Sequence, residues 1–532
     1  MKYTLFFLFA FIHVSMPGQG NARNVVVSFG ATIPSIGKII GSDHSGCYYY
    51  RRDKDKMFIE HLNRKHEVDR SVECPEMVYH GNKANAQAAW KLGSTICVTY
   101  ASRGSAEVMV ITAQKYDAAT FGPVDSLIKI SESVCLTPAS IVGSGIEVPA
   151  ELFYGIFNIK VVGDSAMIVT GTDWFPPKTH KKDRAVVRIA KYDRDLRQEL
   201  YKEIVLREDQ RNFNITQIYA HRESIEIVGI EFQWLQGGSK HLRASVDRKE
   251  KIDTSFTYHW INVVPGDGPA TCREIRLENQ RVCDLVVGSN QNDEVIFAGF
   301  YSGRYDNYPR GFFYFQGDHS ARLVNNLQLT PFGEGFFSSY FWDEKGKRLS
   351  DSIYQTMYRK KWVMNIQELV PDPTGNGFVM IAEQYIWWGM NYITNDIYVF
   401  GFLNSGEVGW STKIKKSQLA PTNYDLPCLS YKEVHDNKSF HFVFNDDVKN
   451  AGLGAAAQPW VYYCSSMEKK NTRVVRHVEI DFKGNILTDE ALNDVSFKIG
   501  TLWSGKGQEN EIVVWQLTGK GSESKAVSLT FE

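Results

Sequence analysis

The most constraining feature of the sequence is a unit that recurs about eight times after residue 23. Each unit has an apolar strand, a polar or aromatic loop, a second apolar strand, a turn and a third strand. The clearest copy runs through Glu294–Phe300, Gly311–Phe315 and Ala321–Val324. So small a unit cannot bury both of its faces alone, so it must stack against copies of itself. The repeat therefore predicts an all-β chain folded as a β-propeller.

Each unit is interpreted as a blade of four strands, of which the second and third are the clearest. The predicted second strands are Cys47–Tyr50, Ile96–Tyr100, Ala166–Thr170, Ile225–Phe232, Val295–Phe300, Phe378–Glu383, Phe440–Phe444 and Ile512–Leu517. The predicted third strands are Met57–His61, Val108–Ala113, Val186–Ala190, Leu242–Val246, Phe312–Phe315, Ile397–Phe402, Val474–Ile480 and Ala526–Phe531. Many third strands end in Asp, Asn or Gly, which suit tight turns.

The ends of the chain indicate how the ring closes. The last unit stops after its third strand, whereas Asn24–Phe29 is a strand that precedes the first complete unit. We expect this N-terminal strand to be the fourth strand of the last blade, because closure removes exposed edges. The count is then eight four-stranded blades. Seven is the alternative, because the second unit lacks a clean first strand.

The chain is predicted to hold a single propeller domain over residues 23–532, because no linker or low-complexity tract divides it. Residues at about 331–362, aromatic and then basic, fit no blade and are interpreted as an insertion over one face.

The N-terminus has the pattern of a signal peptide spanning residues 1–22. Lys2 precedes an apolar run from Leu5 to Val14, and small residues at Gly20 and Ala22 suit cleavage after Ala22. A run of about 12 apolar residues is too short to cross a bilayer, so no membrane span is predicted. The mature protein is expected to be exported, to the periplasm or beyond. A formal net charge of -1 argues against a nucleic-acid partner.

Eight cysteines in an exported chain permit disulfides. Cys272 and Cys283 flank a segment that could fold as a hairpin with its turn near Glu278-Asn279, and they are the predicted pair. The alternative is that both are buried thiols.

No motif predicts a metal site or any other cofactor. Cysteines and histidines lack zinc-site spacing. Two pairs of histidines lie close together in the sequence, but neither has further ligands at suitable spacing; the pairs are His61 with His66 and His435 with His441.

No catalytic template is present: the chain lacks a GxSxG elbow, an HExxH motif, a P-loop and an EF-hand loop. Five acidic residues lie on or beside the loops between second and third strands, where a pair could act as in a glycosidase. They are Asp173, Asp306, Glu383, Asp396 and Asp446. The plainer interpretation is that these loop acids are solvated.

The same loops carry aromatic residues in four units, and equivalent loops of a propeller leave the same face. Such residues could form a rigid recognition surface, since Trp and Tyr stack on sugar rings or grip peptide side chains. The alternative is that they fold inward and cover the core. The candidate binding residues are Trp174, Trp234, Tyr305, Tyr308, Trp387, Trp388 and Tyr392.

Several strand and loop motifs stand out in the second half of the chain: Gly299–Ser302 with Gly311–Tyr314, Ala382–Tyr385 with Asn395–Val399 and Glu407–Trp410, and the ending Glu509–Trp515. They resemble motifs of a family of uncharacterised exported repeat proteins from Bacteroidetes. The similarity covers roughly residues 280–532. The resemblance implies export and a repeat β fold. It brings no activity and no catalytic residues.

Three functions are compatible with these patterns. The first is a non-catalytic exported protein that binds a glycan or a protein ligand through the aromatic loops. The second is a polysaccharide hydrolase or lyase that uses loop carboxylates. The third is a structural component of the envelope. The sequence names no ligand and predicts no oligomeric state.

Overall fold

The computed structural model describes residues 25–531 with gaps in some connections. The gaps are 34–36, 54–55, 104–107, 135–156, 174–183, 207–212, 222–223, 233–255, 267, 291, 293, 304–308, 318–322, 333–362, 389–390, 421–427, 451–458, 460–461, 465–472, 493–497, 502–503, 508–509 and 518–523. Residues 1–24, which include the predicted signal peptide, and most of the predicted insertion lie outside this description.

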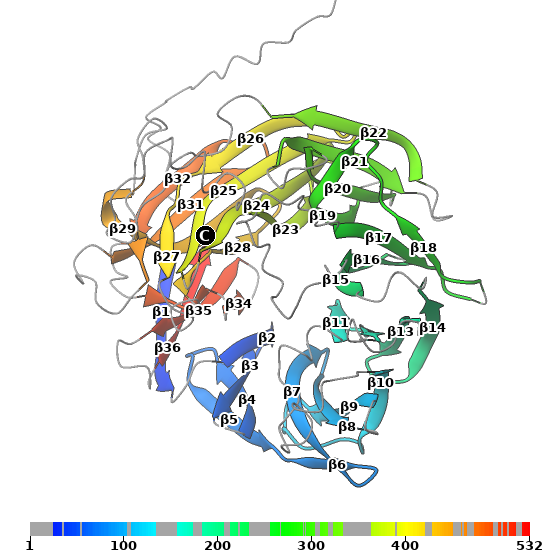
Figure 1. The fold of residues 1–532 in the computed structure, drawn as a ribbon. Coiled ribbons are helices and arrows are strands. Elements are labelled where there is room, and N and C mark those ends of the chain that lie inside the picture. Colours follow the sequence, from blue (N-terminus) through cyan, green and yellow to red (C-terminus); the bar gives the residue numbers. More distant parts are fainter. Residues whose placement is uncertain are drawn as a thin grey trace, which may run out of the picture.

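The described strands form eight sheets arranged as blades around one axis (Figure 1). In the first seven blades the first strand along the chain lies nearest the axis and the following strands lie successively farther out, whereas in the last blade the N-terminal strand of the chain is outermost. The structure thus confirms the predicted all-β propeller with eight four-stranded blades and removes the alternative of seven.

The first four blades follow one another along the chain. Blade 1 consists of β2 (Gly37–Asp43), β3 (Gly46–Asp53), β4 (Lys56–Asn63) and β5 (Val68–Cys74). Blade 2 consists of β7 (Asn82–Leu92), β8 (Thr95–Arg103), β9 (Val108–Asp117) and β10 (Ile128–Val134), with the short β6 (Met77–Tyr79) beside β7. Blade 3 consists of β11 (Phe157–Val162), β12 (Ala166–Thr172), β13 (Val186–Asp193) and β14 (Gln198–Val205). Blade 4 consists of β15 (Phe213–Ala220), β16 (Ile225–Phe232), β17 (Phe256–Val263) and β18 (Thr271–Glu274).

The other four blades complete the ring, and short strands add to the sheets of blades 6 and 8. Blade 5 consists of β19 (Gln280–Ser289), β20 (Val295–Gly303), β21 (Gly311–Gly317) and β22 (Leu323–Pro331). Blade 6 consists of β23 (Val363–Pro371), β24 (Gly377–Trp388), β25 (Asn391–Leu403) and β26 (Val408–Ile414), and its sheet continues into β27 (Gln418–Ala420) and β30 (Tyr462–Tyr463). Blade 7 consists of β28 (Lys432–His435), β29 (Ser439–Asp447), β31 (Arg473–Asp481) and β32 (Ile486–Leu492), with a 3-10 turn η3 (Val448–Asn450) after β29. Blade 8 consists of β33 (Lys498–Ile499), β34 (Gly505–Lys506), β35 (Glu511–Leu517), β36 (Ser524–Phe531) and β1 (Val25–Ile33).

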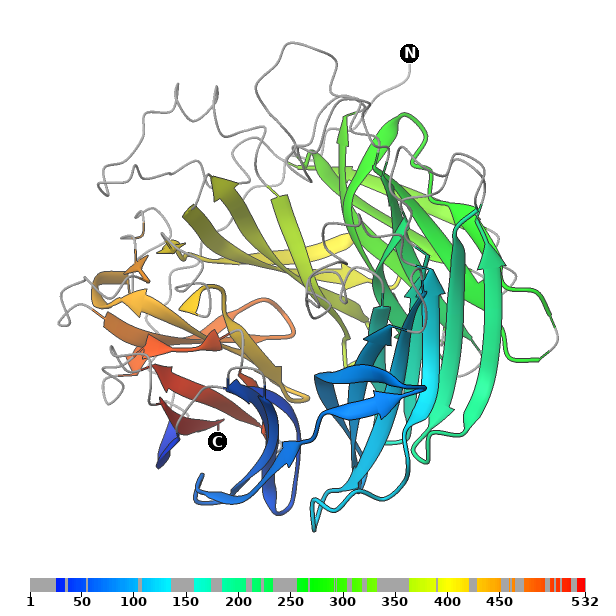
Figure 2. The ribbon, with the colours of Figure 1, turned by 60° about the horizontal axis from the view of Figure 1, so that its bottom comes forward.

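The N-terminal strand closes the ring as predicted. β1 pairs antiparallel with β36 from Val25 opposite Phe531 to Ile33 opposite Ser524. Figure 2 shows the blue N-terminal strand beside the red C-terminal strands, next to blade 1. The last blade therefore takes strands from both ends of the chain, so the ring has no open blade.

Two strand predictions needed correction. The third strand of the fourth unit is β17 and not Leu242–Val246, which lies outside the described residues; β17 pairs with the whole of β16. The missed first strand of the second unit is β7, which pairs along β8. β7 is rich in alanine, and alanine has a low strand propensity, so the sequence pattern did not reveal it.

The core is divided into apolar layers between successive blades. Each layer joins the facing sides of two neighbouring blades, and a layer between blades 8 and 1 completes the circle. In that last layer the rings of Tyr49 and Trp515 lie 5.0 Å apart. Because both faces of a blade are covered, strands such as β20 and β29 are buried at almost every residue, and they read as continuous apolar runs.

Within the described part of the chain, no helix is long and apolar enough to cross a membrane.

Removal of β1 should weaken the whole ring. We expect a chain lacking residues 1–33 to unfold at a lower temperature than a chain lacking only residues 1–22. Each lost inter-strand hydrogen bond costs about 0.5–1.5 kcal/mol, and β36 becomes an exposed edge. Thermal unfolding followed by circular dichroism measures the first effect, and light scattering measures association through the bared edge. Equal midpoints without association would contradict the closing role of β1.

Candidate functional site

The predicted aromatic loop of blade 6 is a paired hairpin rather than a loop. β24 and β25 stay paired to their tips, past a register shift between Glu383 and Tyr385, with Trp387 opposite Tyr392 and Trp388 opposite Asn391. Among the described residues, the inner strand β23 pairs with β24 from Pro371 opposite Phe378 to Val363 opposite Tyr385. We call residues 386–394, at the tip of the hairpin, the arm. Its aromatic and β-branched residues favour the extended conformation, which explains why the strands continue.

Two short strands support the arm. β27 pairs with β25 from Tyr392 to Thr394, and β30 pairs in parallel with β27. Tyr392 is half-buried and packs against a small cluster formed by Ala420, Cys428, Leu429, Tyr462 and Cys464. For Tyr392 the structure thus favours inward packing, and this contact fixes one strand of the arm.

The other candidate aromatic residues follow the second strands of blades 3, 4 and 5. Trp174, Trp234, Tyr305 and Tyr308 lie outside the described residues, and their role in binding stays a prediction. The strands on either side of them are in place, since β12 pairs with β13, β16 with β17 and β20 with β21. Their connections leave the blades at the same ends as the arm, because the blades share one strand order. We call this side of the ring the loop face.

The interpretation of the loop acids as solvated residues is wrong for the four that the structure describes. Asp173, Glu383, Asp396 and Asp446 are all buried. Asp306 lies outside the described residues. Acidic side chains are rarely buried unless they are paired, so each of the four must have polar partners.

Asp173 and Asp446 pair with arginines of the neighbouring third strands. Asp173 forms an ion pair with Arg188 and accepts a hydrogen bond of 2.8 Å from the backbone nitrogen of Val134. Asp446 forms a 3.0 Å ion pair with Arg476. Burial raises the pKa of Asp446 to about 6, although Arg476 opposes this shift. These carboxylates hold strand ends together.

Glu383 belongs to a buried network that fixes the base of the arm. The Lys416 ammonium donates hydrogen bonds to Glu383, to Thr394 at 2.9 Å and to Gln418 at 3.1 Å. Ser430 donates to the other oxygen of Glu383 at 2.6 Å. The network joins β24, β25 and β27 to the segment that enters blade 7. Glu383 is therefore a support for the arm, and the carboxylate is shielded from solvent.

A different group of titratable residues lies on the inner strands. Glu368 comes from β23, whereas Glu433 and His435 come from β28. Each offers one donor atom, and the three atoms lie within 4.8 Å of one another. The Nδ1 atom of His435 is 2.8 Å from a carboxylate oxygen of Glu433. This inner cluster of Glu368, Glu433 and His435 is the one group of at least three possible metal ligands among the described residues.

The inner cluster was only partly visible in the sequence. Glu433 and His435 are two residues apart on a strand, so they face the same way, and this spacing was a usable signal. Glu368 lies on the neighbouring blade, 65 positions before Glu433 in the sequence. Only the stacking of blades 6 and 7 brings it close to Glu433.

The inner cluster has shifted acid–base equilibria. The Glu368 side chain reaches solvent, but protein surrounds it on most sides. This partial burial raises the pKa of Glu368 to about 7, and the negative charge of Glu433 is the second cause of the shift. The hydrogen bond with Glu433 raises the pKa of His435. Burial lowers the pKa of the adjacent Lys432. Glu368 can therefore hold a proton near neutral pH.

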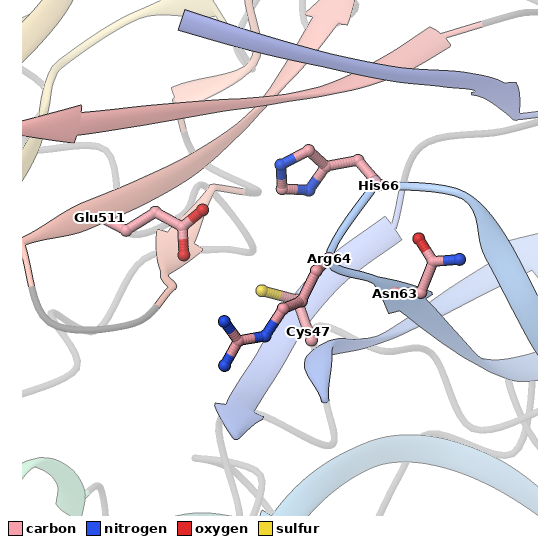
Figure 3. Close-up of a pocket in the computed structure, with 6 residues that line it drawn as sticks. Cys47, Asn63, Arg64, His66 and Glu511 are labelled. Carbon is pink, nitrogen blue, oxygen red and sulfur yellow. The ribbon is translucent and has the colours of Figure 1, made fainter. Parts of the chain in front are cut away.

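A cavity of about 90 Å³ lies at the seam of blades 1 and 8 (Figure 3). Cys47, His66 and Glu511 lie around it, together with Asn63 and Arg64. Burial raises the pKa of Cys47 to about 12 and lowers the pKa of His66. Both groups are therefore neutral near pH 7, so the thiol is not a nucleophile there. His61, the sequence partner of His66, is instead 2.6 Å from Asp69.

The two cysteines of the predicted disulfide lie on strands of different blades. Cys272 lies on β18, the outer strand of blade 4, and Cys283 lies on β19, the inner strand of blade 5. The predicted turn is present at Glu278, which has a φ of 45°. However, Cys272 packs with the layer between blades 3 and 4, and Cys283 with the layer between blades 5 and 6. The pairing stays a prediction.

No protein-family model matches the chain, and no curated protein matches it. The fold is similar to that of several solved structures. The WD40 domain of SCAP from fission yeast is 8% identical with a TM-score of 0.35, over 94% of this chain and 98% of that chain. The β-propeller domain of the trilobed protease from Pyrococcus furiosus is 10% identical with a TM-score of 0.34, over 84% and 97%.

The polysaccharide lyase Uly1 is 8% identical with a TM-score of 0.38, over 86% of this chain and 94% of that chain. These neighbours include both enzymes and binding domains, and similarity this low carries no argument about activity. The class that the blades and their closure define is a β-propeller, a fold consistent with a binding role.

Loss of the Lys416 ammonium should destabilise the base of the arm strongly. We expect Lys416→Met to cost about 3–5 kcal/mol of unfolding free energy, because Glu383 would be left charged and buried. The matched control is Lys413→Met. Lys413 is 3.9 Å from Asp396 with a third of its side chain exposed, so its loss should cost less than about 1 kcal/mol. Chemical denaturation measures both values, and equal losses would contradict this role of Lys416.

The raised pKa of Glu368 predicts a pH-dependent stability. A carboxyl group whose pKa is raised by folding stabilises the fold fully below its unfolded value, near 4.5, and this contribution is lost as the pH rises through about 7. Glu368→Gln should therefore match the wild type at pH 5 in unfolding temperature and exceed it at pH 8. The comparison is made in EDTA. A difference independent of pH would contradict the raised pKa of Glu368.

Proposed function

We propose that this protein is an exported, non-catalytic binding protein that recognises a glycan or a protein ligand through the loop face. The observation that carries the proposal is the arm, in which Trp387 and Trp388 lie on a paired backbone. A rigid hairpin loses little conformational entropy on binding, and this favours affinity. Export is supported by the signal-peptide pattern and by the resemblance to exported Bacteroidetes repeat proteins.

The way in which the arm is supported also favours binding. Tyr392 and the strand β27 hold one side of the hairpin, and the Lys416 network holds its base. Recognition sites work best when rigid elements and a supporting shell fix the contacting residues. Trp is among the residues that contribute most to binding energy at interfaces. The aromatic residues of blades 3, 4 and 5 would extend the surface around the axis.

The alternative of a polysaccharide hydrolase or lyase receives less support. It relied on loop carboxylates that would be free to meet a substrate. Asp173, Glu383 and Asp446 instead form ion pairs or hydrogen bonds in buried positions, and Asp396 is buried with them.

The test is a glycan array and a cell-wall pull-down with the mature chain beside the double variant Trp387→Ala/Trp388→Ala. We expect saturable binding by the wild type and a loss of about tenfold or more, equivalent to about 1.4 kcal/mol, in the double variant. The matched control is Tyr201→Ala, since Tyr201 is 45% exposed on the outer strand β14. It should bind as the wild type does.

Binding that is lost in the double variant but kept in the Tyr201 control would establish the loop face as the recognition surface. Binding that both variants retain would place the ligand elsewhere on the ring. If the folded wild type binds none of the tested ligands, the role of a structural component of the envelope becomes the better supported function.

A further inference from the structure

The inner cluster has a mixed set of donor atoms from two blades. Glu368 and Glu433 supply carboxylate oxygens, and His435 supplies an imidazole nitrogen, all within 4.8 Å of one another. Three donors at this spacing can converge on one ion after small side-chain rotations, because metal–ligand bonds of about 2 Å place ligand atoms roughly 3–4 Å apart. The cluster also differs from an ordinary ion pair, since it brings two carboxyl groups together.

A neighbouring side chain gives a second, independent observation. The hydroxyl oxygen of Tyr431 is buried and has no hydrogen-bond partner. Buried polar atoms are nearly always paired, so an orphaned hydroxyl calls for a polar partner. Tyr431 lies close to Glu383, Glu433 and Glu368, whose charges act on it together with burial. A water or hydroxide bound to an ion at the inner cluster would be such a partner.

The donor types select among metals. Imidazole nitrogen suits zinc and other transition metals, whereas magnesium and calcium prefer oxygen donors, and calcium takes six to eight. Two positively charged side chains also act on the cluster, Lys432 on Glu368 and Lys506 on His435. Their repulsion opposes any divalent cation, so binding must rely on direct bonds to the three ligand atoms. An imidazole nitrogen among these ligands favours zinc over magnesium and calcium.

We propose that Glu368, Glu433 and His435 bind one zinc-class divalent cation that joins blade 6 to blade 7 at the inner wall of the propeller. Three protein ligands leave a coordination position for water or for a ligand group. The proposal does not depend on the arm, which is on the loop face, whereas the cluster lies toward the turns between first and second strands. The ion should add a metal bridge between two blades that also meet through apolar packing and the Lys416 network.

The test is isothermal titration of zinc chloride into the full mature chain. We expect one zinc ion per chain and a higher unfolding temperature when zinc is present. Glu433→Gln and His435→Ala should each weaken binding by about tenfold or more and remove the thermal shift. Magnesium and calcium chloride should give neither effect. If Glu433→Gln fails to fold by circular dichroism, Glu368→Gln carries the test, because Glu368 reaches solvent.

Two controls separate this site from other metal-binding groups. Glu73→Gln removes an exposed carboxylate on β5, and His66→Ala removes the imidazole of the cavity at the seam of blades 1 and 8. Both should bind zinc as the wild type does. The proposal is overturned if zinc does not bind, if binding is lost only in His66→Ala, if all variants bind equally, or if calcium and magnesium match zinc.

Discussion

The structure depends on apolar packing between neighbouring blades. A four-stranded blade has two apolar faces, and each face is covered only by the next blade in the circle. A gap anywhere in the ring would expose two such faces at once. The contact of Trp515 with Tyr49 is therefore as important as any other layer, although it joins opposite ends of the chain. The pairing of β1 with β36 holds blade 8 together at that seam.

Several buried ion pairs lie where strands end, and there they fix the positions of connections. Asp173 with Arg188, Glu383 with Lys416 and Asp446 with Arg476 each lie at the loop-face end of a blade. A buried ion pair adds little net stability, but a partner cannot be removed without a large penalty. Such pairs thus specify one arrangement of the strand ends. In blade 6 that arrangement includes the arm.

Most second and third strands of the blades could be predicted from the sequence. Neighbouring blades cover both faces of these strands, so they are continuous apolar runs. The sequence also predicted the closing strand, since one unit lacked a fourth strand and the N-terminus had one to spare. It did not reveal β7, whose alanines have low strand propensity, or the pairing inside the arm. The loop acids were misread because their partners, such as Arg476, lie on other strands. Glu368 could not be linked to Glu433 before the blades were stacked.

The arm and the inner cluster occupy different heights on blade 6. Glu368 lies opposite Ile381, and Trp387 is six residues farther along β24, which is about 20 Å in an extended strand. Direct contact between ligands at the two places is thus excluded for small molecules. Two elements connect the two places. β24 carries Trp387 and lies opposite Glu368, whereas the segment of Ser430, which bonds to Glu383 at the base of the arm, continues into β28 with Glu433 and His435. Coupling between a ligand on the arm and an ion at the cluster would therefore require a shift of one of these two elements.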